Sequence, residues 1–569
     1  MKYRLAQIKT EIDESADAIP GIIAKTLRIR ESDVLEWEIR RRSIDSRKKP
    51  HIQYVYTADF VVNKKLNTKK SRDLMEVDEE AETAAVRPPE PGTQKLGGRP
   101  VVVGMGPAGL FAALELAKAG YSPLVLERGP AMPGRIAAVE RFRKERVLDP
   151  EANMLFGEGG AGTFSDGKIG TGIKDSLIRL VLGEFRDAGA GDDIMYLAKP
   201  HIGTDVLREV IVNMRKKIES LGGEVMFNTK LESLEIEDGK LKGIYISDAR
   251  SEIVRRPPRR EEISRRDASP SELMDKVDAR SEIVRREFIR TDVLILAIGH
   301  SARDTFSMIH GSGLDMEQKP FSIGVRMEHP QALIDAAQYG EENVGKLPPA
   351  DYKINYRASN GRGVYSFCMC PGGEVVVCTT AEGELCVNGM SNRKRDSGTA
   401  NSGILCDVRT EDFGSDDVLA GVRFQEKYER LAFKNGGVNY DPPTCTMEEF
   451  LSGGHADHTE HVASADHTDP VTASLPDFAA EAIKEAVPAF ARKIKKYDSP
   501  GTVVKAVETR SSSPVRILRD EHGESNIKGV YPAGEGAGYA GGITSAAIDG
   551  IRAARHIIEK YSPTEIAVK

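Results

Sequence analysis

The sequence predicts an α/β protein whose nucleotide-binding domain is split in two by a long insertion. A strand, a glycine turn, a helix and a second strand follow one another in RPVVVGMGPAGLFAALELAKAGYSPLVLERG, residues 99–129. The order of strand, glycine turn and helix returns at residues 528–560, KGVYPAGEGAGYAGGITSAAIDGIRAARHIIEK. The region between them, from about 321 to 500, alternates strand and helix far less, which is typical of an inserted mixed α+β domain.

The first 63 residues predict a separate small α/β domain. YRLAQIKT is strand-like, HIQYVYTADFVV alternates like a strand, and a helix is expected at about 17–28 between them. The next stretch is charged and then rich in Pro and Gly, so we expect a linker. A duplication, DARSEIVRR, marks an insertion within a meander of short strands. The predicted domains are 1–63, the linker 64–97, the first part of the nucleotide-binding domain at 98–320 with its insertion at about 248–287, the substrate domain at 321–500, and the second part of the nucleotide-binding domain at 501–569.

The bulk composition excludes several classes of protein. Of 569 residues, 80 are Lys or Arg and 87 are Asp or Glu, and the net charge of −7 gives no general case for nucleic-acid binding. The N-terminus, MKYRLAQIKTEIDES, lacks the apolar run of a signal peptide, and no window approaches the roughly 18 apolar residues of a membrane span. The six cysteines are sparse and fall in one region, which suits reduced thiols better than secreted disulfides. We therefore expect a cytoplasmic protein.

A dinucleotide-binding motif, G-x-G-x-x-G, lies between the first strand and its helix. Gly104 permits the tight turn, Gly106 lets a pyrophosphate approach the backbone, and Gly109 lets the helix pack closely on the strand. The helix, which starts at Pro107–Ala108, presents unpaired N–H groups to the phosphates. Glu127 ends the second strand, eighteen residues after Gly109, where a carboxylate accepts hydrogen bonds from ribose hydroxyls. Together these features predict a Rossmann-like domain.

The C-terminal glycine turn favours FAD over NAD as the bound dinucleotide. NAD dehydrogenases do not need the segment YPAGEGAGYAGGI, whereas in a flavoprotein Gly534–Glu535 would lie beside the ribityl and phosphate groups. The helix that starts near Gly542 would point its N-terminus at the N1/C2=O edge of the isoalloxazine and stabilise the anionic reduced flavin. A plain strand–helix turn is the alternative interpretation. With AIGH and NTKL as further contacts, the residues predicted here to bind FAD are Gly534, Glu535, Gly541, Gly542, Ile543, Ala297, Gly299, Lys230 and Leu231.

Several motifs together resemble a bacterial family of FAD-dependent dehydrogenases, often labelled NAD(FAD)-utilising dehydrogenases. They are GMGPAGL, ERG…GR, FGEGGAGTFSDGK, HIGTD, AIGHSARDT, YSFCMCPGGEV, VNGMS, ETRSSSPVRI and YPAGEGAGYAGGITSAAIDGI. The resemblance covers nearly the whole chain, and GPAGL followed by LERG also resembles flavoproteins of the glutathione-reductase type. It implies a flavoprotein fold of two dinucleotide-binding domains with an inserted substrate domain, and no particular reaction. The arginine-rich duplication and a His-rich loop depart from the pattern.

The resemblance also implies that the glycine-rich loop FGEGGAGTFSDGK, residues 156–168, lines the flavin. Its backbone at Gly160–Ser165 would approach flavin N5 and O4, where side chains would be in the way. Lys168 would lie near the ring and favour the reduced flavin, a solvated loop lysine being the alternative. Arg128 and Arg135, in the segment ERGPAMPGR, would neutralise the pyrophosphate. The residues assigned to FAD from this region are Arg128, Arg135, Gly160, Ala161, Gly162, Thr163, Phe164, Ser165 and Lys168.

Lys168 and two further motifs supply the candidate catalytic residues. Cys368 and Cys370 alternate along a predicted strand and would lie side by side, so that a flavin can exchange two electrons with the pair, in its dithiol or disulfide form. Their spacing differs from the C-x-x-C and C-x4-C of known flavin–disulfide reductases, and buried free cysteine is common as a small hydrophobe. Glu508 and Arg510 border a serine run, where the arginine would clamp a substrate carboxylate or phosphate. An Arg–Glu pair that holds the two domains together is the alternative.

We expect an FAD-dependent oxidoreductase that passes hydride between NAD(P)H and an unidentified small-molecule substrate through flavin N5. The sequence has no second strand–G-x-G-x-x-G–helix unit, so NAD(P)H would dock transiently in the substrate cleft. A second hypothesis is a flavin-dependent RNA- or protein-modifying protein, or a redox sensor, that docks through the basic segment IRRRSIDSRKK. The alternatives are a solvated hairpin turn and an intramolecular contact with the acidic remainder of the chain. No aromatic residues interleave these charges, which disfavours nucleic acid. We expect no membrane association, and an oligomer is permitted.

The His-rich loop raises the question of a metal. His455, His458 and His461 recur at a spacing that would place them together on a helix. The neighbouring glycines and threonines favour a polar loop instead, and no cysteine or acid completes a familiar metal pattern. We predict no metal.

Overall fold

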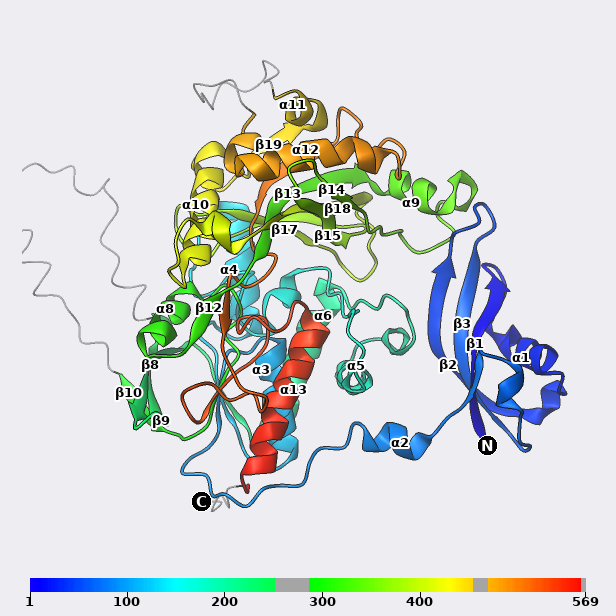
Figure 1. Ribbon diagram of the computed structural model, residues 1–569, viewed down its shortest axis with the longest axis horizontal. Helices are drawn as coiled ribbons and strands as arrows, with labels where there is room; N and C mark the ends of the chain where they lie inside the picture. The colour runs from blue at the N-terminus through cyan, green and yellow to red at the C-terminus, as the bar shows by residue number, and fades with distance from the viewer. Residues whose placement is uncertain (251–285, 454–468, 564–569) are drawn as a thin grey trace, which may run out of the picture.

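The computed structural model describes residues 1–250, 286–453 and 469–563. Most of both DARSEIVRR copies, and all three histidines of the His-rich loop, lie outside these residues. Figure 1 shows the N-terminal domain, drawn in blue, beside a larger body in which the nucleotide-binding domain and the inserted domain are stacked. Each of these parts has its own hydrophobic core.

An antiparallel sheet of four strands, in the order β2-β3-β1-β4, forms the N-terminal domain. Alternate residues of the first strand, among them Tyr3 and Leu5, are buried against α1 and the facing residues of the sheet, as the sequence pattern predicts. The elements are β1 (Lys2–Glu11), α1 (Ile19–Leu27), β2 (Val34–Asp45), β3 (Gln53–Val62) and β4 (Leu74–Glu76).

The linker predicted at 64–97 is partly folded. β4 pairs antiparallel with β1, and the short helix α2 (Glu79–Ala84) follows it. Leu74 is buried in the N-terminal core. Because one buried leucine and backbone pairing hold this short strand at the sheet edge, the charged composition of the segment gave no signal for it. The first part of the basic segment, IRRRSID (residues 39–45), also forms a strand: it is the second half of β2 and not a turn.

A parallel sheet of five strands, in the order β22-β11-β5-β6-β7, is the centre of the nucleotide-binding domain. Its strands come from both parts of the chain, because the C-terminal β22 pairs with β11 and β11 pairs with β5. This confirms the predicted Rossmann-like fold that an insertion divides. Within the described residues it is the only parallel sheet, so the second dinucleotide-binding domain that the resemblance implied is not found there. The strands and their main helices are β5 (Val101–Val103), α3 (Pro107–Lys118), β6 (Leu124–Leu126), α5 (Leu177–Asp187), α6 (Thr204–Ser220), β7 (Glu224–Met226), β11 (Leu294–Leu296), β22 (Val530–Pro532) and α13 (Ile543–Lys560).

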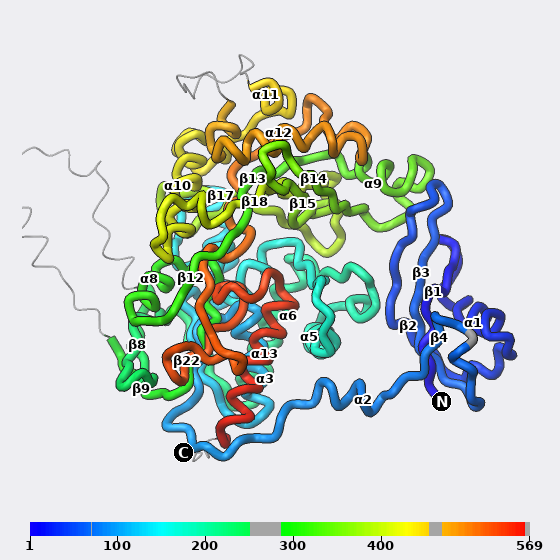
Figure 2. Tube along the Cα trace, in the orientation of Figure 1, coloured from blue at the N-terminus to red at the C-terminus, as the bar shows by residue number. Residues whose placement is uncertain are grey.

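Helices α3 and α13 pack closely against each other, as Figures 1 and 2 show. A Cβ at Gly550 would lie 2.0 Å from the carbonyl oxygen of Ala108, so that only glycine permits this approach. The contact fixes the starts of the two helices relative to each other. The remaining elements of this domain are α4 (Met132–Glu145), β8 (Thr229–Glu237), β9 (Lys240–Asp248), β10 (Glu287–Arg290), α8 (Arg303–Gly311), β12 (Met316–Gln318) and β21 (Val515–Ile517).

The inserted domain is built on an antiparallel sheet of six strands, in the order β14-β15-β18-β13-β20-β19. Helix α12 (Asp477–Ala491) packs across β13, β14, β15 and β18 and covers one face of this sheet (Figure 1). A separate hairpin, β16–β17, lies beside it. The other elements are β13 (Phe321–Pro330), α9 (Gln331–Tyr339), β14 (Asn355–Arg357), β15 (Gly363–Cys370), β16 (Glu374–Cys378), β17 (Cys386–Met390), β18 (Thr399–Val408), α10 (Ala420–Asn435), β19 (Thr444–Thr446), α11 (Met447–Ser452) and β20 (Val503–Glu508).

Within the described ranges, no helix has both the length and the apolar character needed to cross a bilayer.

Candidate functional site

The G-x-G-x-x-G turn is sterically locked. Gly104 has a φ of 93°, and a Cβ there would lie 2.4 Å from the carbonyl oxygen of Ala297. A Cβ at Gly109 would lie 1.9 Å from the carbonyl oxygen of Gly104. Helix α3 follows with Gly106 as its N-cap, and no side chain caps its first N–H groups. The turn therefore places a bare helix N-terminus, with its partial positive charge, at the end of β5.

Glu127 lies next to this turn, at the end of β6, and is 3% exposed. Its carboxylate accepts hydrogen bonds from the backbone N–H of Met105 at 3.0 Å and of Gly129 at 2.8 Å. Burial nevertheless raises the pKa of Glu127. The neighbouring Arg128 pairs with Glu151 at 2.5 Å and Asp304 at 2.8 Å, so its charge is already balanced within the protein.

The second glycine turn mirrors the first. Gly534 has a φ of 80°, and its N–H donates to Asp549 at 2.7 Å. Helix α13 begins after Gly542 and, like α3, has no side-chain cap. Two uncapped helix N-termini thus face the same region from different strands of one sheet.

The glycine-rich loop 156–168 lies between these two helix starts. At Gly160, which has a φ of 70°, a Cβ would lie 3.1 Å from Gly106 Cα. At Gly162 a Cβ would lie 2.8 Å from the side chain of Ile543. The loop therefore bridges the starts of α3 and α13, and its glycines keep the space beside both of them open.

Arg135 holds this loop from behind. Its guanidinium is 0% exposed and donates to the carbonyl oxygens of Asn153, Met154, Glu158 and Gly160 at 2.7–3.2 Å. Burial lowers the pKa of Arg135 to about 10, so it stays charged at neutral pH. The Phe164 ring lies under this guanidinium, 4.8 Å away, and under that of Arg208, 4.5 Å away. Arg135 thus contacts the loop backbone, a position other than the pyrophosphate contact that the sequence suggested.

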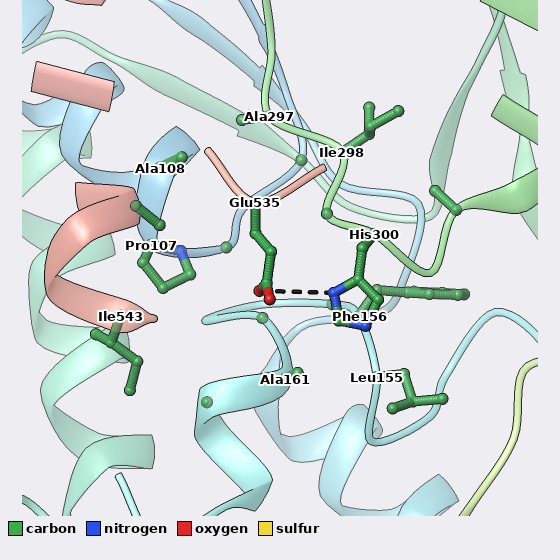
Figure 3. A pocket seen from close by; sticks show the side chains of 18 of the residues that line it. Pro107, Ala108, Leu155, Phe156, Ala161, Ala297, Ile298, His300, Glu535 and Ile543 are labelled. Carbon is green, nitrogen blue, oxygen red and sulfur yellow. Dashed lines mark ion pairs between the residues drawn. The ribbon is translucent and has the colours of Figure 1, made fainter. Parts of the chain in front are cut away.

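A cavity of about 370 Å³ joins the two glycine turns, the loop and the inserted domain. Figure 3 shows Pro107, Ile543, Ala161 and Ala297 around it. The sequence-predicted residues that line it are Gly104, Gly106, Pro107, Ala108, Glu127, Arg128, Gly160, Ala161, Gly162, Ser165, Lys168, Lys230, Leu231, Ala297, Gly299, Cys368, Glu508, Arg510, Glu535, Gly541, Gly542 and Ile543. Those that do not line it, and are buried behind its wall, are Gly109, Arg135, Thr163, Phe164, Cys370 and Gly534.

His300 also lines the cavity, and sequence reasoning missed it although it quoted the motif AIGH. Its Nδ1 lies 3.5 Å from a carboxylate oxygen of Glu535, the dashed line in Figure 3. Its Nε2 and the neighbouring Ser301 hydroxyl are buried and have no hydrogen-bond partner in the described part of the chain. Buried polar atoms rarely stay unpaired, and His300 Nε2 is an unsatisfied polar atom next to the cavity.

The other end of the cavity is polar and is formed largely by the inserted domain. Lys168 Nζ lies 2.9 Å from Asp166, which also pairs with Arg395 and accepts a hydrogen bond from Ser391. Lys168 also lies 3.6 Å from the Cys370 sulfur. Burial alone would lower the pKa of Lys168, but negative charge on the neighbouring cysteines and on Asp166 outweighs it and raises the pKa above its ordinary value. Lys168 is therefore a fixed positive charge in the cavity wall.

Glu508 and Arg510 do not pair with each other. Glu508 accepts from the fully buried Arg326 at 2.8 Å, and burial raises the pKa of Glu508 to about 7 despite this cation. Arg510 pairs with Glu429 of α10 at 2.8 Å, and Glu429 pairs in turn with Arg303 of the nucleotide-binding domain at 2.8 Å. The Arg–Glu contact that joins the domains therefore exists, with partners other than the predicted ones. Arg326 and Glu429 gave no sequence signal, because their roles depend on strand and helix packing.

The residues present fit FAD. A pyrophosphate needs an uncapped helix N-terminus behind a bare glycine turn, and α3 offers one; α13 offers a second for the N1/C2=O edge of the flavin. Glu127 lies where the ribose hydroxyls of the dinucleotide would donate hydrogen bonds to its carboxylate. His300, whose Nε2 is unpaired, also lines the cavity. At Gly160 and Gly162 a side chain would crowd the starts of α3 and α13, so these glycines keep the space between the two helices open for a flat ring.

Comparisons with known proteins agree with this geometry. Residues 102–162 match a model of an NAD(P)-binding Rossmann-like domain, and residues 320–511 match the model "FAD-dependent protein, C-terminal domain-like". Residues 2–61 match a domain of unknown function, DUF8436. An uncharacterized protein of Clostridium beijerinckii is 41% identical over 570 residues, which is 99% of each chain. The chain belongs to the same family as this Clostridium protein, and its residues 320–511 form a domain of FAD-dependent proteins. Its cofactor is FAD, as predicted, and it is an oxidoreductase-type flavoprotein.

Solved structures with a similar arrangement are distant from this FAD-dependent protein. The flavin-dependent brominase Bmp2, as a triple mutant, is 13% identical over 81% of this chain and 79% of its own, with a TM-score of 0.35. The glycerol-3-phosphate dehydrogenase of Bacillus halodurans complexed with FAD is 14% identical over 83% and 67%, with a TM-score of 0.31. A geranylgeranyl bacteriochlorophyll reductase-like protein of Thermoplasma acidophilum is 14% identical over 82% and 78%, with a TM-score of 0.31. Likenesses this distant support no statement about substrate.

The basic segment of the N-terminal domain makes its contacts inside the molecule. The backbone N–H of Arg42 donates to the Tyr196 carbonyl oxygen at 2.6 Å, and the Arg42 carbonyl accepts from Ala198 at 2.9 Å. The edge of β2 is thereby docked on the nucleotide-binding domain. Two residues earlier, Arg40 forms ion pairs with Glu38, Asp59 and Glu82. These contacts favour the intramolecular interpretation of the charges over an RNA surface.

Proposed function

We propose that this FAD-dependent protein transfers hydride between NAD(P)H and a small polar substrate, both of which react at the flavin in the cavity described above. The observation that supports this most is the continuity of that cavity. One end is lined by the dinucleotide motif, and the other by Lys168, Asn388 and Glu508, beyond the residues that FAD itself requires. A ligand at the polar end would lie beside the flavin. We further propose an FAD-binding domain of the glutathione-reductase type, with NAD(P)H entering the same cavity.

The bound FAD supplies the hydride chemistry, and the protein supplies charge and proton positions. Lys168 and the start of α13 place positive charge in the wall, which would favour negative charge on a bound FAD. Glu508, with a pKa of about 7, is placed to give or take a substrate proton near neutral pH. Asn388 lines the cavity, and its side-chain oxygen accepts from Arg326 at 3.0 Å, so its amide N–H groups remain for a substrate.

The test is to purify the protein, identify and quantify its flavin, and mix it anaerobically with NADH or NADPH. We expect about one FAD per chain and bleaching of the flavin absorbance by at least one of the two donors within seconds. Deazaflavin photoreduction serves as the control for a flavin that can be reduced at all. FAD that photoreduces but responds to neither nucleotide contradicts the proposed donor and leaves the cofactor assignment intact.

The pH dependence of reduction should report on Glu508. Below pH 7 the side chain is neutral and the wall keeps an excess of positive charge; above pH 7 the added negative charge opposes formation of the anionic reduced flavin. We therefore expect the rate of reduction to fall about tenfold as pH rises through 7, a barrier change of roughly 1.4 kcal/mol. Glu508→Gln keeps the neutral form and should lose this step. Glu328→Gln, a carboxylate that pairs with Lys505 away from the cavity, should keep it. A step of equal size in Glu508→Gln would contradict the assignment.

A further inference from the structure

Two cysteines meet at the polar end of the cavity. Cys368 lines the cavity, and Cys370 is buried two residues further along β15. A regular strand separates the Cα atoms of such residues by about 6.6 Å, close to the upper limit of about 6.8 Å for a disulfide. This strand is not regular, because its register with β18 shifts between Phe367 and Cys370 and Cys368 has a φ of 41°. The Cys370 thiol folds back toward its neighbour and donates to the Cys368 carbonyl oxygen at 3.2 Å.

Positive charge surrounds this pair. Lys168 Nζ lies 3.6 Å from the Cys370 sulfur, and Arg326 donates to the Cys368 carbonyl oxygen at 3.0 Å. Two groups of ion pairs near the cysteines, Lys168–Asp166–Arg395 and Arg326–Glu508, together hold three cations against two carboxylates. A negative charge on Cys368 would balance the group.

The two thiols differ in acidity. A hydrogen bond from Cys370, together with the charges of Lys168 and Arg326, holds the pKa of Cys368 well below its ordinary value. The same pairing with Cys368, together with burial, raises the pKa of the Cys370 thiol. The site therefore favours one thiolate beside one thiol, the combination from which a disulfide forms.

We propose that Cys368 and Cys370 are a second two-electron redox centre that exchanges electrons with the flavin. In oxidation one S–S bond forms: the Cys368 thiolate and the Cys370 thiol release two electrons and one proton, and oxidised flavin takes up both electrons and that proton to become the anionic reduced form. In the reverse direction reduced flavin returns them, the S–S bond breaks, and one thiolate and one thiol are regenerated. The exchange needs FAD, and it depends on the proposed function only for the source of electrons.

A second cysteine pair in the chain provides a matched control. Cys378 and Cys386 face each other across the β16–β17 hairpin with their sulfurs 3.5 Å apart. Both are buried, and neither lines the cavity. If proximity of sulfurs alone decided redox activity, this pair would qualify equally well.

The test counts electrons in the holoprotein. The protein is oxidised with diamide, desalted, and titrated anaerobically with dithionite while the flavin absorbance is followed. Wild type should take up one more two-electron equivalent per flavin than Cys368→Ser or Cys370→Ser, and Cys386→Ser should match wild type. Peptide mapping of oxidised wild type should show residues 368 and 370 joined, with the loss of two hydrogens.

Two results would overturn the proposal. In the first, the wild-type protein takes up no more reducing equivalents from dithionite than Cys370→Ser does, and the thiols of Cys368 and Cys370 can still be alkylated after diamide treatment. The second is loss of the extra equivalent in Cys386→Ser instead. Because dithionite reduces flavin without a nucleotide, failure of NAD(P)H to react leaves this measurement unaffected. Peptide mapping needs wild type alone, so a variant that misfolds does not block the test.

Discussion

Gly109→Ala should yield a folded protein that has lost its FAD. The added Cβ would lie 1.9 Å from the carbonyl oxygen of Gly104, a backbone atom that cannot rotate away. Either α3 must move from β5 or the turn must open, and both displace the helix N-terminus from the pyrophosphate. We expect FAD affinity to fall at least about a hundredfold, equivalent to roughly 2.8 kcal/mol. The measurement is the ratio of flavin to protein absorbance after gel filtration, with circular dichroism to verify the fold.

Gly183→Ala is the matched control for this substitution. Gly183 is also helical, in α5, but a Cβ there would meet nothing within 4 Å. Because alanine is the better helix former, this variant should bind FAD normally and gain up to about 1 kcal/mol of stability. Full FAD occupancy in Gly109→Ala would show that the turn is not where the dinucleotide binds.

The dinucleotide site could be predicted because each of its parts has a local cause. Gly104 is required by the positive φ of the turn, Gly109 is required by its contact with Gly104 in the same strand–turn–helix unit, and Glu127 follows at a fixed spacing. The same holds for the C-terminal turn, whose helix start faces the same cavity. Such features depend on neighbours close in sequence, so the sequence alone contains the information.

The polar end of the cavity could be predicted only in part. Lys168, Cys368 and Glu508 were recognised as unusual residues, but their partners were not. Glu508 lies next to Arg326 because β20 pairs with β13, and the two residues are 182 positions apart in the sequence. No spacing rule links them. Proximity in sequence suggested an Arg–Glu pair as one of two interpretations of Glu508 and Arg510, but Arg510 instead pairs with Glu429 of α10.

The strand in the predicted linker was missed for a related reason. β4 has three residues, of which only Leu74 is buried. It is held by pairing with β1, which is its neighbour in the sheet but lies at the beginning of the sequence. Charged composition predicts a linker correctly when nothing is available to pair with it. Here an open sheet edge was available.

Arg135→Met should destabilise the protein more than any other single change in the loop region. The fully buried guanidinium donates to four backbone carbonyls of residues 153–160. Methionine removes all four of these bonds and leaves the carbonyls of Asn153 and Met154 without this donor, whereas those of Glu158 and Gly160 still accept from Thr163. The cost should be about 3–5 kcal/mol. Because the carbonyls belong to the loop between α3 and α13, proteolysis within residues 146–170 should also accelerate, and FAD should dissociate faster. Thermal unfolding, limited proteolysis and FAD release measure the three effects.

Arg143→Met separates this role from a general effect of losing charge on α4. Arg143 lies on the same helix, is 40% exposed and pairs only across the surface with Glu374, so its removal should cost no more than about 1 kcal/mol. The two roles of Arg135 then give different results. If Arg135 held the pyrophosphate directly, Arg135→Met would lose FAD while the apoprotein kept its stability and its loop stayed resistant to protease. If Arg135 holds the loop, the apoprotein itself is weakened, and added FAD restores only part of the loss.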